Sequence, residues 1–252
     1  MQQQRRCGKC SACDGSGWVE RHDDYLGLDH VTMVPCPDPA GVHRAAEVAR
    51  LSRISGLLPE ELALRLDDVI ERGDTAGVET LPVEGLVAQQ NTTAMLELAR
   101  RFVERPWGFL TLHGEYGNAK TLVLQAVINE FRERHGIVGT HVRMRDLLEY
   151  VRAGYAPNAQ DDARARYERL KALPILAIDE FDAARMTDFA YEFRTAFLDD
   201  RYRLAVTCRA HTLFAMNCDP VELPGDLYDR LRDGRFVIFH NADVSMRPAM
   251  VR

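Results

Sequence analysis

The stretch Gly108-Phe-Leu-Thr-Leu-His113 is followed directly by Gly114-Glu-Tyr-Gly117-Asn-Ala-Lys120-Thr121. The first part is an apolar run that predicts a buried strand, and the second is a glycine turn that leads into a helical pattern over residues 122–134. A glycine loop that ends in Lys-Thr between a strand and a helix is typical of a phosphate-binding loop. There the backbone N–H groups face the phosphates, the lysine neutralises the β and γ oxygens, and the threonine hydroxyl holds Mg²⁺. The expected nucleotide contacts are Gly114, Glu115, Tyr116, Gly117, Asn118, Ala119, Lys120, Thr121 and Leu122.

Ala119 departs from the usual loop pattern, G-x-x-x-x-G-K-[ST], because a glycine normally precedes the lysine. If this position requires a positive φ, alanine costs roughly 1 kcal/mol there. The alternative interpretation is an ordinary glycine turn between a strand and a helix. A second acidic element downstream favours the nucleotide-binding interpretation.

That second element is the apolar run Pro174-Ile-Leu-Ala-Ile178, which two acidic residues follow. Such a run predicts a fully buried parallel strand, and open α/β sheets bind ligands beyond the carboxyl ends of their strands. We therefore expect Asp179 to orient the Mg²⁺ shell with Thr121, and Glu180 to polarise the attacking water as a general base. Apolar runs at 204–206 and 235–239 predict two further strands. Thr207, at the tip of the first, is a candidate sensor of the γ-phosphate.

The composition suits one domain of ordinary size with a small appendage. The chain has 252 residues, of which 46% are hydrophobic and 28% charged, so we expect a sizeable core and little bulk disorder. The net charge of −6 excludes a globally basic nucleic-acid binder but allows a local basic patch. The candidate patch is the basic helix 164–171, and the alternative is a solvated helix face. The neighbouring arginines of this candidate are Arg143, Arg145 and Arg152.

The start of the chain, Met-Gln-Gln-Gln-Arg-Arg, is followed by no apolar segment. No run approaches the ~20 apolar residues of a membrane span. We therefore expect no secretory signal, no membrane association and a cytoplasmic protein, in which thiols stay reduced.

Four of the six cysteines lie near the N-terminus, in the spacing C-x2-C-x2-C followed by a distant Cys-Pro. Clustered thiolates in a reduced compartment are typical of a metal site, and tetrahedral Cys₄ is a common structural geometry of Zn²⁺. One alternative is an iron–sulfur cluster, for which this spacing is also typical, and another is a set of unligated thiols. The fourth zinc ligand stays open between Cys7, Asp38 and His43. The four cysteines are Cys7, Cys10, Cys13 and Cys36.

These signals divide the chain into three parts. Residues 1–44 form a cysteine-rich zinc-binding segment, 45–105 are helical leading elements, and 106–252 are the nucleotide-binding core. In the helical part we expect one helix over 45–54. Asn91-Thr-Thr has good capping chemistry and is expected to open a second helix.

The order and spacing of the motifs resemble the DnaC/IstB group of AAA+ ATPases, the bacterial and phage replicative-helicase loaders and transposition helper ATPases. The resemblance covers roughly residues 55–247. The cysteine-rich start, with its Gly-Ser-Gly turn, looks like that of several phage and Gram-positive loaders, in which a small zinc domain contacts the helicase. The motifs that carry the resemblance are Gly56-Leu-Leu-Pro, the phosphate loop, Arg145-Asp-Leu-Leu, Ile178-Asp-Glu, Asp-Arg-Tyr202, Asp229-Arg-Leu231 and Ser-Met-Arg247.

The resemblance implies an AAA+ P-loop fold, an α/β three-layer sandwich with a central parallel sheet, and ATP as the nucleotide. It implies that Arg230 is an arginine finger that reaches the ATP of a neighbouring subunit, and that Arg247 is a cis-acting sensor. Because such a finger stabilises charge on the transferring phosphoryl group, hydrolysis would depend on assembly of an ATP-bound homo-oligomer. Arg209 stands where these ATPases usually place a polar sensor, commonly Asn. With Ala119, this departure predicts a slow, switch-like ATPase.

The expected function is ATP-dependent loading of a replicative DNA helicase onto single-stranded DNA. The alternative is a transposition helper that assembles on duplex DNA and recruits a transposase. The N-terminal cysteine module favours the loader, because the helpers begin with a helical segment instead. A third hypothesis is a nucleotide-binding scaffold with a degenerate site.

Overall fold

In the computed structural model the described residues are 18–25, 28–36, 42–69, 82–156, 162–183, 187–243 and 245. The chain divides into two compact units, Met1–Arg53 and Ile54–Arg252. Residues 54–105, which the sequence analysis separated from the core, therefore belong to the same unit as the core. Several residues with predicted roles lie outside the described ranges. These are Cys7, Cys10, Cys13, Asp38 and Arg247.

The first unit contains a hairpin and most of a helix. Strands β1 (Trp18–Tyr25) and β2 (Leu28–Pro35) pair antiparallel, and Cys36 follows β2 directly. Helix α1 (Val42–Ser55) begins three residues before the helix expected from the sequence. Because three of the predicted zinc ligands lie outside the described residues, the zinc site stays a prediction.

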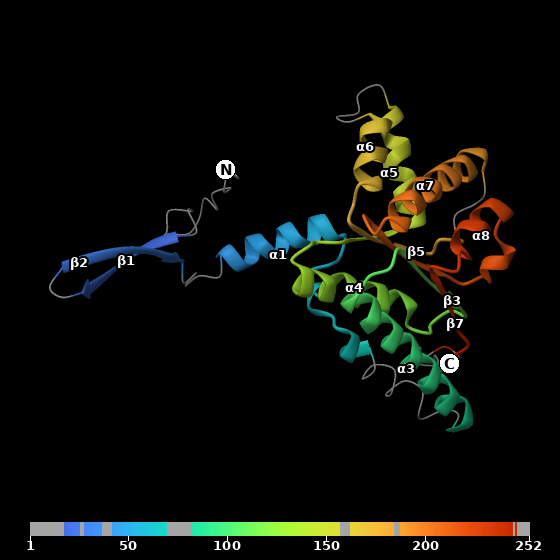
Figure 1. Cartoon of the computed structure of the whole chain (residues 1–252), viewed down its shortest axis with the longest axis horizontal. Coiled ribbons are helices and arrows are strands. Elements are labelled where there is room, and N and C mark those ends of the chain that lie inside the picture. The colour runs from blue at the N-terminus through green and yellow to red at the C-terminus, as the bar shows by residue number, and fades with distance from the viewer. Residues whose placement is uncertain are drawn as a thin grey trace, which may run out of the picture. The chain divides into compact units, whose positions relative to one another are not determined.

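The second unit is built on a five-stranded sheet in the order β4-β5-β6-β3-β7 (Figure 1). Every pairing in it is parallel, as the apolar strand runs predict. The strand that precedes the glycine loop, β3, lies between β6 and β7, so the loop emerges near the middle of the sheet. The strands are β3 (Phe109–Gly114), β4 (Thr140–Arg143), β5 (Ile175–Asp179), β6 (His211–Met216) and β7 (Val237–Asn241).

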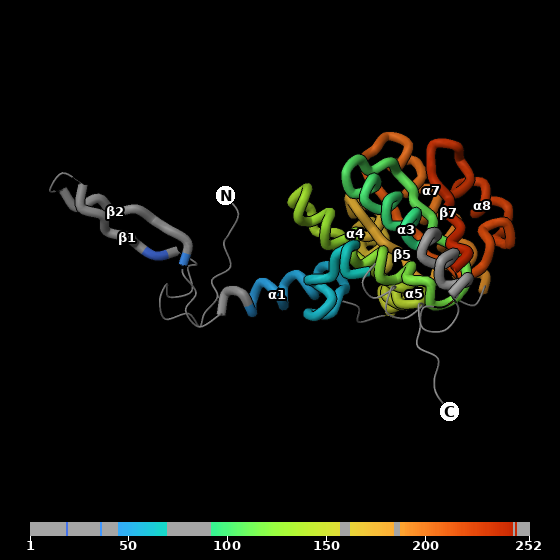
Figure 2. Tube along the Cα trace, turned by 90° about the horizontal axis from the view of Figure 1, so that it is seen from below, coloured from blue at the N-terminus to red at the C-terminus, as the bar shows by residue number. Residues whose placement is uncertain are grey.

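Helices cover both faces of this sheet, which gives three layers (Figure 1, Figure 2). Successive strand residues point to opposite faces. Phe109, Leu176 and Phe214 pack in one core with residues of α5, α6, α7 and α8, while α3 and α4 pack together and α4 contacts the sheet from the other side. The elements that flank the sheet are η1 (Glu61–Ala63), α3 (Pro82–Glu104), α4 (Lys120–His135), α5 (Met144–Arg152), η2 (Ala153–Tyr155), α6 (Ala163–Lys171), α7 (Asp188–Val206), η3 (Pro220–Glu222) and α8 (Gly225–Leu231).

Two sequence-based boundaries are wrong. The run 204–206 is the end of α7 and not a strand, because Phe197, Arg201 and Ala205 bury one face at helical spacing. The strand in this region is β6, which begins at His211. The helix expected to open at Asn91 begins at Pro82 and runs past Asn91 without a break.

In the ranges that the structure describes, no helix combines the length and the apolar character needed to cross a membrane.

Arg201 ties α7 to the strand that follows it. Its guanidinium is fully buried and donates to Thr212 Oγ1 at 3.0 Å and to the carbonyl oxygens of Lys171, Leu173 and His211. Burial lowers the pKa of Arg201 to about 10, which still leaves the side chain charged at neutral pH. The guanidinium therefore joins α6, α7 and β6 through one buried hub.

We predict that Arg201→Met lowers the free energy of unfolding by about 2–4 kcal/mol, because it leaves several buried acceptors without a donor. The control is Arg203→Met, two residues away on the same helix. Arg203 forms an exposed ion pair with Asp199, so this change should cost under about 0.5 kcal/mol. Urea denaturation of both variants measures the difference, and equal stabilities would contradict the structural role of Arg201.

Candidate functional site

The loop between β3 and α4 is held by residues in the left-handed backbone region. Gly117 has a φ of 83°, and Ala119, the N-cap of α4, has a φ of 65° and a ψ of 6°. The position before Lys120 therefore does require a positive φ, and alanine accepts there the strain that glycine would avoid. This backbone turns the start of α4 toward the carboxyl end of the sheet, and the N-terminus of a helix is a favourable place for phosphate.

The ammonium group of Lys120 is buried inside this loop. Its Nζ atom donates to the carbonyl oxygens of Gly114 at 2.8 Å and Glu115 at 2.7 Å, and to Asn118 Oδ1 at 2.8 Å. All three acceptors belong to the loop itself. The lysine therefore holds the loop closed around its own charge, in the position where a phosphate-binding lysine is needed.

A reciprocal amide pair anchors the same loop to β7. Asn118 Nδ2 donates to the carbonyl oxygen of Asn241, and Asn241 Nδ2 donates to that of Asn118, both at 3.0 Å. Both side chains are fully buried. Gly114 allows this approach, because a Cβ atom there would collide with the carbonyl oxygen of Asn241. The end of β7 thereby fixes the amide that accepts from Lys120.

The acidic residues lie opposite the loop, at the end of β5. Thr121 Oγ1 donates to Asp179 Oδ2 at 2.8 Å, and the backbone N–H of Glu180 donates to Asp179 Oδ1 at 2.9 Å. Burial alone would raise the pKa of Asp179, but the His141 and Thr121 side chains and this N–H shift it below its usual value. Glu180 is exposed and has a φ of 49°, an uncommon backbone conformation that is often found at functional sites.

The next strand, β6, ends at the same edge and presents Asn217. The carboxylate of Asp182, two residues after Glu180, accepts the backbone N–H groups of Asn217 and Cys218 at 2.9 Å each. Behind it lies the buried Arg194, whose pKa burial lowers and the Asp182 charge partly restores. The segment that carries the acidic pair therefore also fixes the end of β6.

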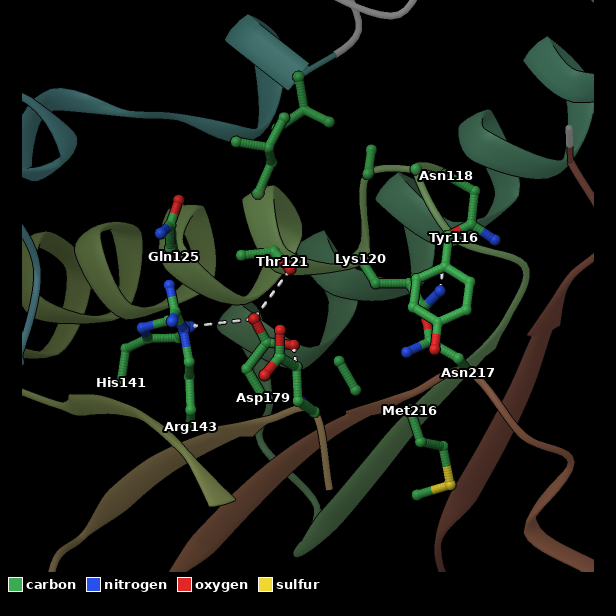
Figure 3. A pocket seen from close by; sticks show the side chains of 16 residues that line it. Tyr116, Asn118, Lys120, Thr121, Gln125, His141, Arg143, Asp179, Met216 and Asn217 are labelled. Carbon is green, nitrogen blue, oxygen red and sulfur yellow. Dashed lines mark hydrogen bonds and ion pairs between the residues drawn. The ribbon is translucent and has the colours of Figure 1, made fainter. Parts of the chain in front are cut away.

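These elements surround one cavity of about 510 Å³ (Figure 3). The loop from Tyr116 to Leu122 forms one wall, and Asp179, Glu180 and Asn217 line the opposite side. The size falls within the range of small-molecule and cofactor sites. A buried lysine, a helix N-terminus and a hydroxyl beside a carboxylate are the donors and oxygen ligands that a triphosphate with Mg²⁺ requires. The residues present therefore fit this ligand.

Several predicted residues lie elsewhere. Thr207 is the exposed C-cap of α7, and its hydroxyl donates to the carbonyl oxygens of Arg203 and Leu204. It does not line the cavity, so the prediction of a strand-tip sensor at Thr207 is wrong. Arg209 follows the same helix end and is likewise not at a strand tip. Arg230, in α8, pairs with Asp199 at 3.0 Å and lies outside this cavity, as a residue acting on a neighbouring subunit would.

Four lining residues were missed by the sequence analysis: Gln125 in α4, His141 and Arg143 in β4, and Asn217. Asn217 was detectable in principle, because Asn217-Cys218-Asp219-Pro220 ends the apolar run 212–216. His141 and Arg143 alternate with apolar residues in a short strand, and nothing in the sequence says which face of the sheet carries the site.

The described residues contain no group of three or more His, Cys, Asp or Glu side chains able to hold a metal ion. Cys36 and His43 are the two candidate zinc ligands that fall in the described ranges. The zinc prediction depends on the residues outside those ranges and is not tested by this observation.

Two solved structures share this fold. The structure of DnaI aligns with a TM-score of 0.54 and 18% sequence identity, over 79% of this chain and 99% of that one. A proposed primosome component from Streptococcus pyogenes serotype M3 gives the same score and identity, over 79% of this chain and 98% of that one. No family model and no curated protein sequence matches the chain.

The likeness concerns the fold and not the sequence, since the identities are low. The five-stranded parallel sheet with helices on both faces and a phosphate-type loop after β3 is the AAA+ P-loop fold. The fold implied by the motif order is therefore confirmed.

We predict that Ala119→Gly raises the free energy of unfolding by about 1 kcal/mol. Relief of the left-handed strain is worth about 1–2 kcal/mol, and the added freedom of the unfolded chain offsets about 0.4–1 kcal/mol of it. A rise of about 2–4 °C in Tm should follow. The matched control is Ala94→Gly in α3, an exposed helical position that should lose about 1 kcal/mol. Destabilisation by both changes would show that Ala119 is not strained.

Proposed function

We propose that this chain is an ATP-dependent loader that delivers a replicative DNA helicase onto single-stranded DNA. The observation that carries the proposal is the convergence of Lys120, Thr121, Asp179, Glu180 and Asn217 on one cavity at the carboxyl edge of the sheet. The motif order that resembles the DnaC/IstB group, and the fold shared with DnaI, support the same assignment.

The residues of the cavity suggest a division of work. Lys120 would exchange its loop carbonyls for the β and γ oxygens of ATP, and Thr121 with Asp179 would hold Mg²⁺. Mg²⁺, when bound, would neutralise charge on the transferring phosphoryl group. Glu180 reaches into the cavity from the strained turn after β5 and would orient and deprotonate the attacking water.

Asn217 takes the sensor role that the sequence analysis gave to Thr207. It lines the cavity at the end of β6, and the Asp182 carboxylate holds its backbone. Its amide is of the type that donates to an oxygen of the γ-phosphate. This assignment removes one of the two reasons to expect slow turnover, because Arg209 is not the sensor. The strained Ala119 remains.

Arg230 would complete the site of a neighbouring subunit. It is half-buried, pairs with Asp199 and lies over the ring of Tyr202 at 5.1 Å, so α7 presents it in a defined position. A finger supplied in trans would make hydrolysis depend on a homo-oligomer formed with ATP. Arg247, the proposed cis sensor, follows β7 and lies outside the described residues. Hydrolysis would then release the assembly, provided that ATP and ADP states differ in affinity for it.

The surface of α5 and α6 is the proposed contact with single-stranded DNA. Helix α6 carries four basic residues and one acidic residue. Beside them, Tyr155 is 69% exposed, and Tyr150 is 40% exposed with the Arg166 guanidinium over its ring. Basic groups next to exposed aromatic rings suit a strand whose bases stack and whose phosphates need counter-charge. Because Arg143 lines the cavity and α5 begins at the next residue, ATP and DNA sites would be directly connected.

The N-terminal unit would be the module that binds the helicase, with Zn²⁺ holding its cysteine-rich segment together. A zinc-stabilised module suits a segment too small to build a core of its own. The transposition helper stays the alternative and differs in its DNA preference.

We predict that Asn217→Ala lowers kcat for ATP hydrolysis at least about tenfold, because a donor aimed at the transferring phosphoryl group acts mainly in the transition state. ATP affinity should change much less. Thr207→Ala is the control and should leave both quantities unchanged, since Thr207 caps a helix away from the cavity. Steady-state hydrolysis and a binding titration separate the two effects, and a loss of turnover in Thr207→Ala with none in Asn217→Ala would restore the sequence-based assignment.

We also predict that a non-hydrolysable ATP analogue strengthens binding to single-stranded DNA over duplex. Changing both Arg145 and Arg164 to Gln should weaken binding and reduce the slope of log affinity against log salt by about 2, since each lost phosphate contact removes about one unit. Arg101→Gln, an exposed arginine on α3 beneath the other face of the sheet, is the matched control.

Fluorescence anisotropy with labelled oligonucleotides measures these affinities. ATP-dependent assembly on duplex would favour the transposition helper. Weak binding to both forms, indifferent to nucleotide and to the two arginines, would contradict a DNA-binding role for this surface.

A further inference from the structure

His141 is a buried polar side chain without an evident structural task. It is only 9% exposed, and its Nε2 atom has no hydrogen-bond partner among the described residues. Leaving such an atom unpaired costs about 1–3 kcal/mol, so its presence needs an explanation. In β4 it alternates with Val142, which packs into the opposite core, so His141 faces the cavity that it lines.

The ring nitrogen points at the carboxylate that is proposed to hold Mg²⁺ (Figure 3). His141 Nε2 lies 3.7 Å from Asp179 Oδ2, which is too long for a hydrogen bond. The same Oδ2 atom lies 2.8 Å from Thr121 Oγ1. A hydroxyl, a carboxylate oxygen and an imidazole nitrogen therefore converge at one point on the cavity wall.

These separations suit one shared ion. Donors that each lie about 2.0–2.2 Å from a metal are about 3 Å apart at a right angle and about 4 Å apart on opposite sides. The two observed distances are close to this range. Mg²⁺ prefers oxygen ligands and water, whereas an imidazole nitrogen favours later divalent ions of the first transition row.

We propose that His141 is a direct ligand of the divalent ion beside the phosphate loop, and that it gives this site a preference for a transition-metal ion over Mg²⁺. The proposal rests on the proposed function, since the ion would be bound together with the triphosphate. Thr121 and Asp179 supply the oxygen ligands, the phosphates supply others, and His141 supplies the nitrogen. A histidine that only positioned Asp179 would hydrogen-bond to it and would not touch the ion.

The test is pulsed electron paramagnetic resonance of the full chain with Mn²⁺ and inorganic triphosphate, a probe that contains no nitrogen. We expect a ¹⁴N coupling of the size typical of a directly bound imidazole, lost in His141→Gln and kept in His240→Gln, an exposed histidine on β7. In a parallel competition titration, the preference for Co²⁺ over Mg²⁺ should fall about tenfold or more in His141→Gln.

Two failures are distinguishable. If Mn²⁺ and triphosphate bind tightly but the wild-type signal shows no ¹⁴N coupling, His141 is not a ligand, and the nucleotide-binding function stands. If Mn²⁺ with triphosphate does not bind at all, the proposed function and this proposal both fall. Because the decisive signal is recorded on the wild-type chain, a folding defect in His141→Gln does not change the conclusion.

Discussion

The ammonium group of Lys120 is the charge around which the site is built. A buried ammonium needs acceptors, and here they are two loop carbonyls and the Asn118 amide. Asn118 in turn exchanges hydrogen bonds with Asn241 at the end of β7. The left-handed turn at Ala119 lets the chain enter α4 with this charge facing the acidic end of β5. Loop shape, sheet order and the position of the cavity all depend on this arrangement.

Motifs that are contiguous in sequence were predictable. The loop 114–121 and the strand that ends at Asp179 announce themselves through glycine spacing and apolar runs, and their order implied the fold that the structure shows. Ala119 was recognised as a strained position from the pattern alone. Each of these features depends on local chemistry, which a single sequence displays directly.

Features that depend on which face of an element is buried were not predictable. The run 204–206 is apolar like a strand, yet it continues a helix whose buried face passes through Arg201, a charged residue that no pattern would place in a core. That one misassignment moved the predicted sensor from Asn217 to Thr207. His141 was missed for a related reason: in a four-residue strand, only the three-dimensional pairing with β5 shows that it faces Asp179.

The central claim is that this cavity binds a nucleoside triphosphate through Lys120. Isothermal titration of the wild-type chain with Mg²⁺ and a non-hydrolysable ATP analogue tests it directly, with Lys120→Met as the variant and Lys171→Met, a lysine on α6, as the control. We predict saturable binding to one site per chain, weakened at least about tenfold in Lys120→Met and unchanged in Lys171→Met. Absence of binding to the wild-type chain, or equal affinity in all three proteins, would contradict the account.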